Sequence, residues 1–195
     1  MASDLQDRLE LALLASNEGV WDWYVGEREI YYSDRVLDFL GYPADKAPNI
    51  ILQARKYFHQ DEVAELRDTF KKIVKKNGDD TLAHDCRYLH PNGSWRWLRI
   101  RGVVVRDDDG MAYRIVGSII DISQRKNAET ALKEERHRLR ELIENIPINV
   151  YYKDTESRFV LANSSTAEKL GAKSEHDLLG KTDRDFFDKR HADMG

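Results

Sequence analysis

His84 and Cys86 are the side chains of this sequence whose types and spacing best suit ligand or metal chemistry, because they lie two residues apart in TLAHDCRYLH. That run is expected to be a strand, and alternate residues of a strand share one face. Both side chains would then stand on the face that carries Leu82 and Tyr88. Two ligands are too few for a metal site, so the pattern favours packing, with the wall of a mixed pocket as the alternative.

Catalytic motifs are absent from the sequence, which contains no G-x-S-x-G, no phosphate-binding G-x-x-x-x-G-K-[ST] and no H-E-x-x-H. His137 lies at an outward position of a charged helical run, which favours a solvated surface histidine over a phosphoacceptor. His59 precedes a long helix, where capping or packing is the expected role and ligand contact is the alternative. We therefore expect that this chain is not an enzyme.

Aromatic side chains offer another kind of chemistry, an apolar ligand cavity between a sheet and its helices. The candidate pocket residues are Trp23, Tyr31, Phe39, His84, Cys86, Tyr88 and Trp97. An ordinary filled core would explain the same aromatic residues equally well. In WRWLRIRG, one register turns Trp95, Trp97 and Arg99 toward the helices. The other turns Leu98 and Ile100 inward, and both registers stay open.

The elements that must position these residues follow from hydrophobic periodicity and turn signals. In chain order they are a helix at 4–16, a hairpin at 20–33, short helices, a long helix at 61–78 and strands at 81–90, 94–107 and 111–123. The last three strands are separated by PNG and DDDG, which are hairpin signals and predict an antiparallel meander. Residues 1–123 are therefore expected to form an α+β domain with helices on one face of the sheet.

A long helix is expected at residues 124–146, directly after the last strand. Its apolar seam has coiled-coil spacing and consists of Ala128, Leu132, Leu139, Leu142 and Ile146. Asp121 and Ser123 stand at the passage from strand to helix, where the Asp121 carboxylate can accept hydrogen bonds from the first helical amides. We expect these two residues to transmit movement of the strand into the helix, with a plain N-cap as the alternative.

Residues 147–195 repeat the order found near the start of the chain. YVGEREIYYSDRVLDFLGY and YKDTESRFVLANSSTAEKLGA align, with Leu40-Gly41 opposite Leu170-Gly171. The second copy has no three-strand meander, so we expect the N-terminal half of a second domain within a longer protein. The expected parts are thus a domain at 1–123, a helical linker at 124–146 and a half-domain at 147–195.

Composition excludes several classes of function. The net charge is −4 and the basic residues are interspersed with acids, so no basic face is expected for nucleic acid. A single cysteine excludes an internal disulfide and fits a reducing compartment. No apolar run reaches the ~20 residues of a membrane span, so we expect a cytoplasmic segment without membrane contact.

Four segments in this order, FLGY, FHQDE, HPNGSWRWLRIRGVVVRDDDG and GSIIDISQRKNAE, resemble a PAS domain across residues 18–129. PINVYYKDTESRFVLANSSTAEKLG and LLGKTDRDFF resemble the first half of a second PAS unit. The resemblance implies a five-stranded antiparallel sheet with helices on one face. The chain lacks the family's haem-ligating histidine, since none of residues 61–76 is His, and its flavin-reactive N-C-R-F-L-Q motif, so the cofactor stays unknown.

The resemblance implies a cytoplasmic sensory module that senses a small ligand or cofactor and passes the change through the linker helix to a downstream output domain. The alternative is a ligand-free interaction and dimerisation module of a sensor histidine kinase or of a diguanylate cyclase or phosphodiesterase. In either case a homodimer through the N-terminal and linker helices is expected.

Overall fold

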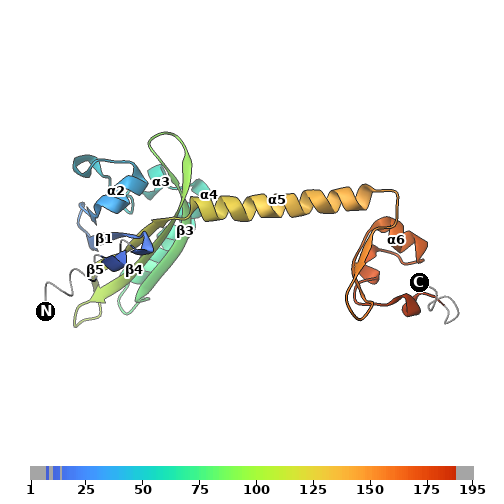
Figure 1. Ribbon diagram of the computed structural model, residues 1–195. Coiled ribbons are helices and arrows are strands. Elements are labelled where there is room, and N and C mark those ends of the chain that lie inside the picture. Colours follow the sequence, from blue (N-terminus) through green and yellow to red (C-terminus); the bar gives the residue numbers. More distant parts are fainter. Residues whose placement is uncertain (1–7, 9–10, 14, 188–195) are drawn as a thin grey trace. The chain divides into compact units, whose positions relative to one another are not determined.

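The computed structural model describes residues 8, 11–13 and 15–187 of the chain (Figure 1). The chain divides into two compact units, with the boundary between Asn127 and Ala128. The described residues within the helix expected at 4–16 are helical, and the rest of that helix lies outside the described residues. In the part of the chain that is described, no helix is both long and apolar enough to cross a membrane.

A five-stranded antiparallel sheet forms the frame of the first unit, as predicted. Its strands are β1 (Gly19–Tyr24), β2 (Tyr31–Tyr32), β3 (Thr81–Leu89), β4 (Trp95–Arg106) and β5 (Ala112–Asp121). Their order across the sheet is β2-β1-β5-β4-β3. The three long strands form the expected meander, and β1 joins it by pairing with β5.

Helices cover one face of this sheet (Figure 1). They are α2 (Asp34–Leu40), the 3-10 helix η1 (Ala44–Lys46), α3 (Ala54–Tyr57) and α4 (Gln60–Val74). Leu98 and Ile100 of β4 are buried beneath them, whereas Trp97 is only half-buried. Successive residues of a strand face opposite sides, so the register left open by the sequence is the one with Leu98 and Ile100 inward.

The Trp21 indole fills the middle of the core. Trp21 of β1 pairs with Gly117 of β5, which pairs in turn with Gly102 of β4. A Cβ atom on Gly102 would lie 3.1 Å from the Trp21 Cζ2 atom, so the indole rests on space that the glycine leaves open. Its Nε1 donates to the Arg101 carbonyl oxygen at 3.1 Å, which satisfies the buried N–H.

The helix α5 (Ser123–Asn145) follows β5 along the chain and, from Ala128 on, belongs to the second unit. The rest of that unit contains β6 (Tyr151–Lys153), β7 (Phe159–Ala162), α6 (Ser164–Lys169) and the 3-10 helices η2 (Glu175–Asp177) and η3 (Asp183–Asp185). The internal repeat is visible in the backbone, because Gly41 after α2 and Gly171 after α6 both adopt left-handed φ values, 74° and 70°. Glycine takes this conformation without a steric penalty.

Candidate functional site

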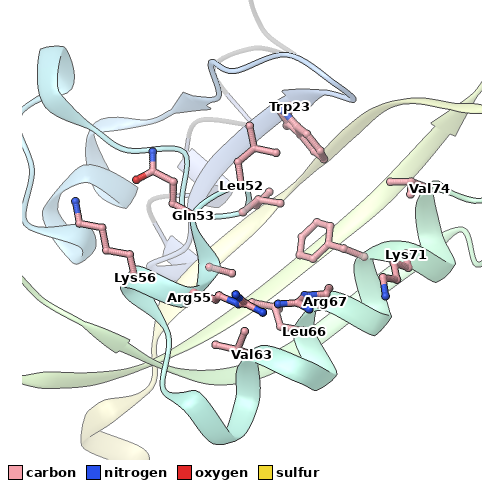
Figure 2. A pocket seen from close by; sticks show the side chains of 13 residues that line it. Trp23, Leu52, Gln53, Arg55, Lys56, Val63, Leu66, Arg67, Lys71 and Val74 are labelled. Carbon is pink, nitrogen blue, oxygen red and sulfur yellow. The ribbon is translucent and has the colours of Figure 1, made fainter.

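A cavity of about 520 Å³ lies in the first unit between α3, α4 and the edge of β1 (Figure 2). The volume is within the range of small-ligand sites. Trp23 and Leu66 form buried parts of its wall, and the Trp23 ring meets Phe70 edge to face at 6.5 Å between centroids. The cavity therefore has an apolar floor made by the sheet and by the inner side of α4.

Of the pocket residues predicted from the sequence, Trp23 lines this cavity. Phe39, Cys86 and Tyr88 are buried among the other core side chains. The Tyr88 hydroxyl donates to the Leu40 carbonyl oxygen at 3.0 Å, and the Cys86 thiol faces the Leu98 carbonyl oxygen at 3.7 Å. Burial raises the pKa of the Cys86 thiol, so this cysteine is an inert core residue rather than a reactive one.

The prediction is wrong for the other six pocket residues, since Trp23 is the one among the seven that lines this cavity, and two of the six do not even face the core. Tyr31 is 62% exposed, because its neighbour Tyr32 takes the inward position of β2. Trp97 lies on the face of the sheet opposite α3 and α4, because Leu98 and Ile100 occupy the inward positions of β4. Neither side chain lines the cavity.

His84 is buried on the inward face of β3, but it does not line the cavity. Its Nε2 atom has no hydrogen-bond partner among the described residues. Its Nδ1 atom lies 3.8 Å from the carboxylate of Glu65 on α4. A buried imidazole nitrogen without a hydrogen-bond partner lowers the free energy of unfolding, so His84 destabilises the first unit.

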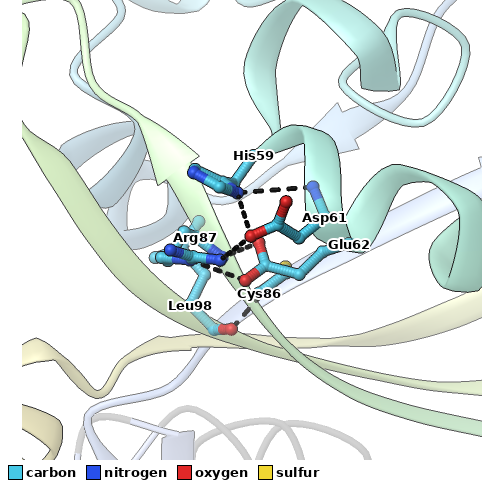
Figure 3. Close-up of polar contacts among 6 residues, drawn as sticks. All are labelled: His59, Asp61, Glu62, Cys86, Arg87 and Leu98. Carbon is cyan, nitrogen blue, oxygen red and sulfur yellow. Dashed lines mark hydrogen bonds and ion pairs between the residues drawn. The ribbon is translucent and has the colours of Figure 1, made fainter.

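The first turn of α4 is fastened to β3 by a group of charged side chains (Figure 3). Arg87 donates from Nε to Glu62 at 2.6 Å, and its backbone N–H donates to the same carboxylate at 2.9 Å. A further hydrogen bond of 3.2 Å joins Arg87 to Asp61. His59 caps the helix by accepting from the Asp61 amide at 3.3 Å, which is the capping role expected from the sequence.

Trp97 connects this charged group to the linker helix. The Arg87 guanidinium lies 5.5 Å from the centre of the Trp97 ring. The Lys126 ammonium of α5 lies 5.0 Å from the same centre. Both distances are within the range of cation–π attraction, so one indole contacts a side chain held by α4 and a side chain of α5.

Asp85 provides a second anchor for the start of α5. Its carboxylate makes two hydrogen bonds with Arg99, at 2.6 and 2.9 Å, and lies 3.3 Å from the Lys126 ammonium. The hydrogen bond with Arg99, followed by that with Lys126, lowers the pKa of Asp85 to about 2. The carboxylate is therefore ionised across the physiological range and holds the first turn of α5 on the sheet.

The two residues predicted to transmit a signal lie at the same junction. Asp121 Oδ1 accepts from the Ser123 backbone N–H at 2.8 Å. The Ser123 hydroxyl oxygen accepts from the Trp97 backbone N–H at 2.9 Å. The end of β5 and the start of α5 are thus joined to β4 through side-chain oxygens as well as through the strand ladder.

Sequence reasoning missed Asp85, Arg87 and Lys126. A signal was available, because Asp85 and Arg87 occupy outward positions of β3 and face Arg99 and Trp97 across the strand pair. A charged residue opposite an aromatic or oppositely charged one is a stabilising cross-strand pair. Lys126 could not be paired with them before the path of α5 was known.

The seam predicted on the linker helix is exposed. Leu132, Leu139 and Leu142 are 53, 49 and 58% exposed, and no residue of α5 is buried. Ala128 is exposed as well, and Ile146 lies just beyond the end of the helix. His137 is a surface residue 3.4 Å from Glu141.

Comparison with known proteins agrees with this geometry. A family model described as the PAS fold matches residues 29–119, and a second model with the same description matches residues 143–194. A crystal structure of a sensory box histidine kinase/response regulator from Burkholderia thailandensis is 30% identical, with a TM-score of 0.57. The match covers 69% of this chain and 98% of that one. The chain belongs to the PAS family.

The relatives of this PAS chain include signalling proteins. The sensor protein FixL of Bradyrhizobium diazoefficiens is 24% identical over 84% of the chain, and the chain spans 32% of the length of FixL. The N-terminal domain of a diguanylate cyclase with a PAS/PAC sensor from Marinobacter aquaeolei is 23% identical. That match covers 56% of this chain and 98% of the other, with a TM-score of 0.49.

Proposed function

We propose that this PAS chain is the cytoplasmic sensory part of a signalling protein. Its first unit senses a small ligand in the cavity between α3, α4 and β1. The change then passes into α5 and along it toward a downstream output domain. Such a device works only if the ligand favours one arrangement of α4 and α5 over another.

The observation that carries this proposal is the shared contact at Trp97. The helix α4 contributes Leu66 to the cavity wall and Glu62 to the hydrogen bonds of Arg87. Arg87 and Lys126 both contact the Trp97 ring. A shift of α4 would move Arg87 against the indole and so change the contact that holds the first turn of α5.

The ligand is best sought by comparing native and denaturing mass spectra of freshly purified protein, together with an absorption spectrum. A small molecule that is present under native conditions and lost on denaturation supports the sensor. Replacing Asp121 with Ala in the full-length protein then tests transmission. An unchanged signal response in that variant contradicts a role for the junction.

The second candidate function is a ligand-free interaction module, and the exposed seam of α5 favours it. Leu132, Leu139 and Leu142 recur at coiled-coil spacing on a helix that buries none of its residues. We propose that this seam, with the N-terminal helix, forms a homodimer. A chain without bound small molecule that dimerises with rising concentration, and becomes monomeric when the three leucines are changed to Ser, supports this function.

The output belongs to the longer protein. We propose a histidine kinase or an enzyme of cyclic-di-GMP metabolism as the downstream domain, and no catalysis by the residues of this chain. The names of the similar proteins support a signalling context. Assays of autophosphorylation and of cyclic-di-GMP turnover on the full-length protein distinguish the two outputs.

A further inference from the structure

The cavity between α3 and α4 has an uneven distribution of charge around its apolar floor. Four basic side chains line it: Arg55, Lys56, Arg67 and Lys71. Among the described residues, those that line it include no aspartate or glutamate. The chain as a whole carries more acidic than basic residues, so a cavity lined by charges of one sign departs from the average surface.

The four basic side chains differ in their contacts with the described residues. Lys71 lies 3.7 Å from Asp68, and the Lys56 ammonium lies 5.0 Å from the centre of the Tyr57 ring. Within the described ranges, neither Arg55 nor Arg67 makes an ion pair or a side-chain hydrogen bond. In Figure 2 their guanidinium ends point toward one another between α3 and α4.

We infer that the cavity takes an anionic amphiphile, a molecule with an apolar body and a carboxylate or phosphate-monoester head. The body would lie against Trp23 and Phe70, and the head would lie between Arg55 and Arg67. This inference rests on the proposed function, because it assumes that the cavity is the ligand site. It adds the chemical class of the ligand.

Physical chemistry favours this class over its neutral and cationic counterparts. An apolar body gains free energy in proportion to the apolar surface that it removes from water on the cavity floor. Guanidinium groups match carboxylates and phosphates in geometry and make strong, charge-assisted hydrogen bonds with them. An anion also relieves the repulsion between two like charges, whereas a cation would add to it.

The test uses four probes with one chain length: octanoate, octyl phosphate, 1-octanol and octylammonium. Binding to the full chain is measured by calorimetry and by the fluorescence of the tryptophans, one of which lines the cavity. We expect at least one of the anions to bind ~10-fold or more tightly than 1-octanol, and octylammonium to bind more weakly than 1-octanol. Added salt should weaken the binding of the anions and leave that of 1-octanol unchanged.

The double variant Arg55→Gln/Arg67→Gln locates the head group. It should lose the ~10-fold preference for the anion and keep the affinity for 1-octanol. The matched control is Lys72→Gln/Lys76→Gln, which removes the same charge at exposed residues that do not line the cavity. This control should keep the preference.

Each contrary result points to a different failure. Equal affinity for octanoate, octyl phosphate and 1-octanol overturns the anionic class and leaves the ligand site in place. An anion preference that survives in Arg55→Gln/Arg67→Gln overturns the assignment of the head group to these arginines. Failure of all four probes to bind overturns this inference, and the mass spectra then decide separately whether the first unit binds a ligand of another class.

Discussion

The two units of the molecule use the same pair of hydrogen bonds at corresponding positions. In the first unit, Val20 N–H donates to Ser33 Oγ at 2.9 Å and Ser33 N–H donates to the Val20 carbonyl oxygen at 2.8 Å. In the second unit, Val150 N–H donates to Asn163 Oδ1 at 3.1 Å and Asn163 N–H donates to the Val150 carbonyl oxygen at 3.0 Å. The first unit has Ser33 at this position and the second unit has Asn163. This difference gives the second unit additional hydrogen bonds to the end of α5.

Asn163 has an amide group that Ser33 lacks. Its Nδ2 atom donates to the carbonyl oxygens of Ile143, Ile146 and Ile148 at 3.0, 3.3 and 2.8 Å. The residue is fully buried, and its Oδ1 atom also accepts from the backbone N–H of Thr166 at 3.0 Å. One side chain thus ties the end of α5 to β7 and α6 within the second unit.

The two ends of α5 are also held by carboxylates in different surroundings. At its start, Asp85 of the sheet binds Arg99 and lies 3.3 Å from Lys126 of the helix. At its end, Glu144 of the helix accepts from the backbone N–H and the hydroxyl of Ser164, at 2.9 and 2.6 Å. The side-chain hydrogen bond of Ser164 lowers the pKa of Glu144. Charged side chains thus hold both ends of α5 to the elements next to them.

Substitution of Asn163 should produce the largest loss of stability, because it removes the side chain by which the second unit differs from the first. Asn163→Ala leaves buried donors and acceptors without a partner, and we expect the free energy of unfolding of the second unit to fall by about 3 kcal/mol. Asn163→Ser keeps an oxygen that can accept from the Val150 N–H, so the free energy of unfolding should fall by less than in Asn163→Ala. Native-state hydrogen exchange measures the two units separately.

The matched control for this experiment is Ser33→Ala. It removes a partly buried hydrogen bond from the first unit and should cost about 1 kcal/mol there, with no change in the second unit. Equal losses from Ser33→Ala and Asn163→Ala would show that the additional amide of Asn163 contributes nothing.

Acid should weaken the anchor at Asp85. Because the folded state lowers the pKa of this carboxyl from 3.8 to about 2, its contribution to stability is complete above the unfolded pKa and is lost as the pH falls through about 2. Solvent screening at this partly exposed carboxylate reduces that contribution to about 1 kcal/mol, and Asp85→Asn should remove both it and its share of the pH dependence. Urea unfolding of both proteins from neutral to acidic pH measures the difference, and parallel curves would refute the anchor.

His84 should respond to substitution in the opposite direction from Asn163, although both are buried polar residues. His84 Nε2 is without a partner among the described residues, whereas Asn163 uses both its amide oxygen and its amide nitrogen. We expect His84→Leu to stabilise the first unit by about 1 kcal/mol. Thermal unfolding of this variant measures the effect, and a marked loss of stability would indicate that the imidazole has a hidden partner.

Local signals in the sequence predicted the framework of the molecule. PNG and DDDG placed the turns of the meander. The end of the last strand and Pro147 placed α5 within one residue of its observed ends. The alignment of Leu40-Gly41 with Leu170-Gly171 predicted the repeat in the second unit. It also places Ser33 opposite Asn163, so the corresponding hydrogen bonds of the two units could have been predicted from the sequence.

Contacts between distant segments could not be predicted in this way. The alternation in WRWLRIRG did not reveal which face was inward, because both faces carry large side chains. In the structure Trp97 is outward, and there it lies 5.0 Å from the ammonium of Lys126, a residue 29 positions further along the chain. The cluster of basic side chains at the cavity was missed because Arg55 and Arg67 belong to different helices.

The measurement that tests the central claim most directly is hydrogen exchange of α5 in Arg87→Gln. This change is on β3, and it removes both the ion pair with Glu62 and the cation over Trp97. We predict faster exchange in the first turns of both α4 and α5. Arg101→Gln, on the same face of the sheet and paired with Glu18, should leave both turns unchanged. Unaltered exchange at the start of α5 in Arg87→Gln would contradict the claim that α4 and α5 are coupled through Trp97.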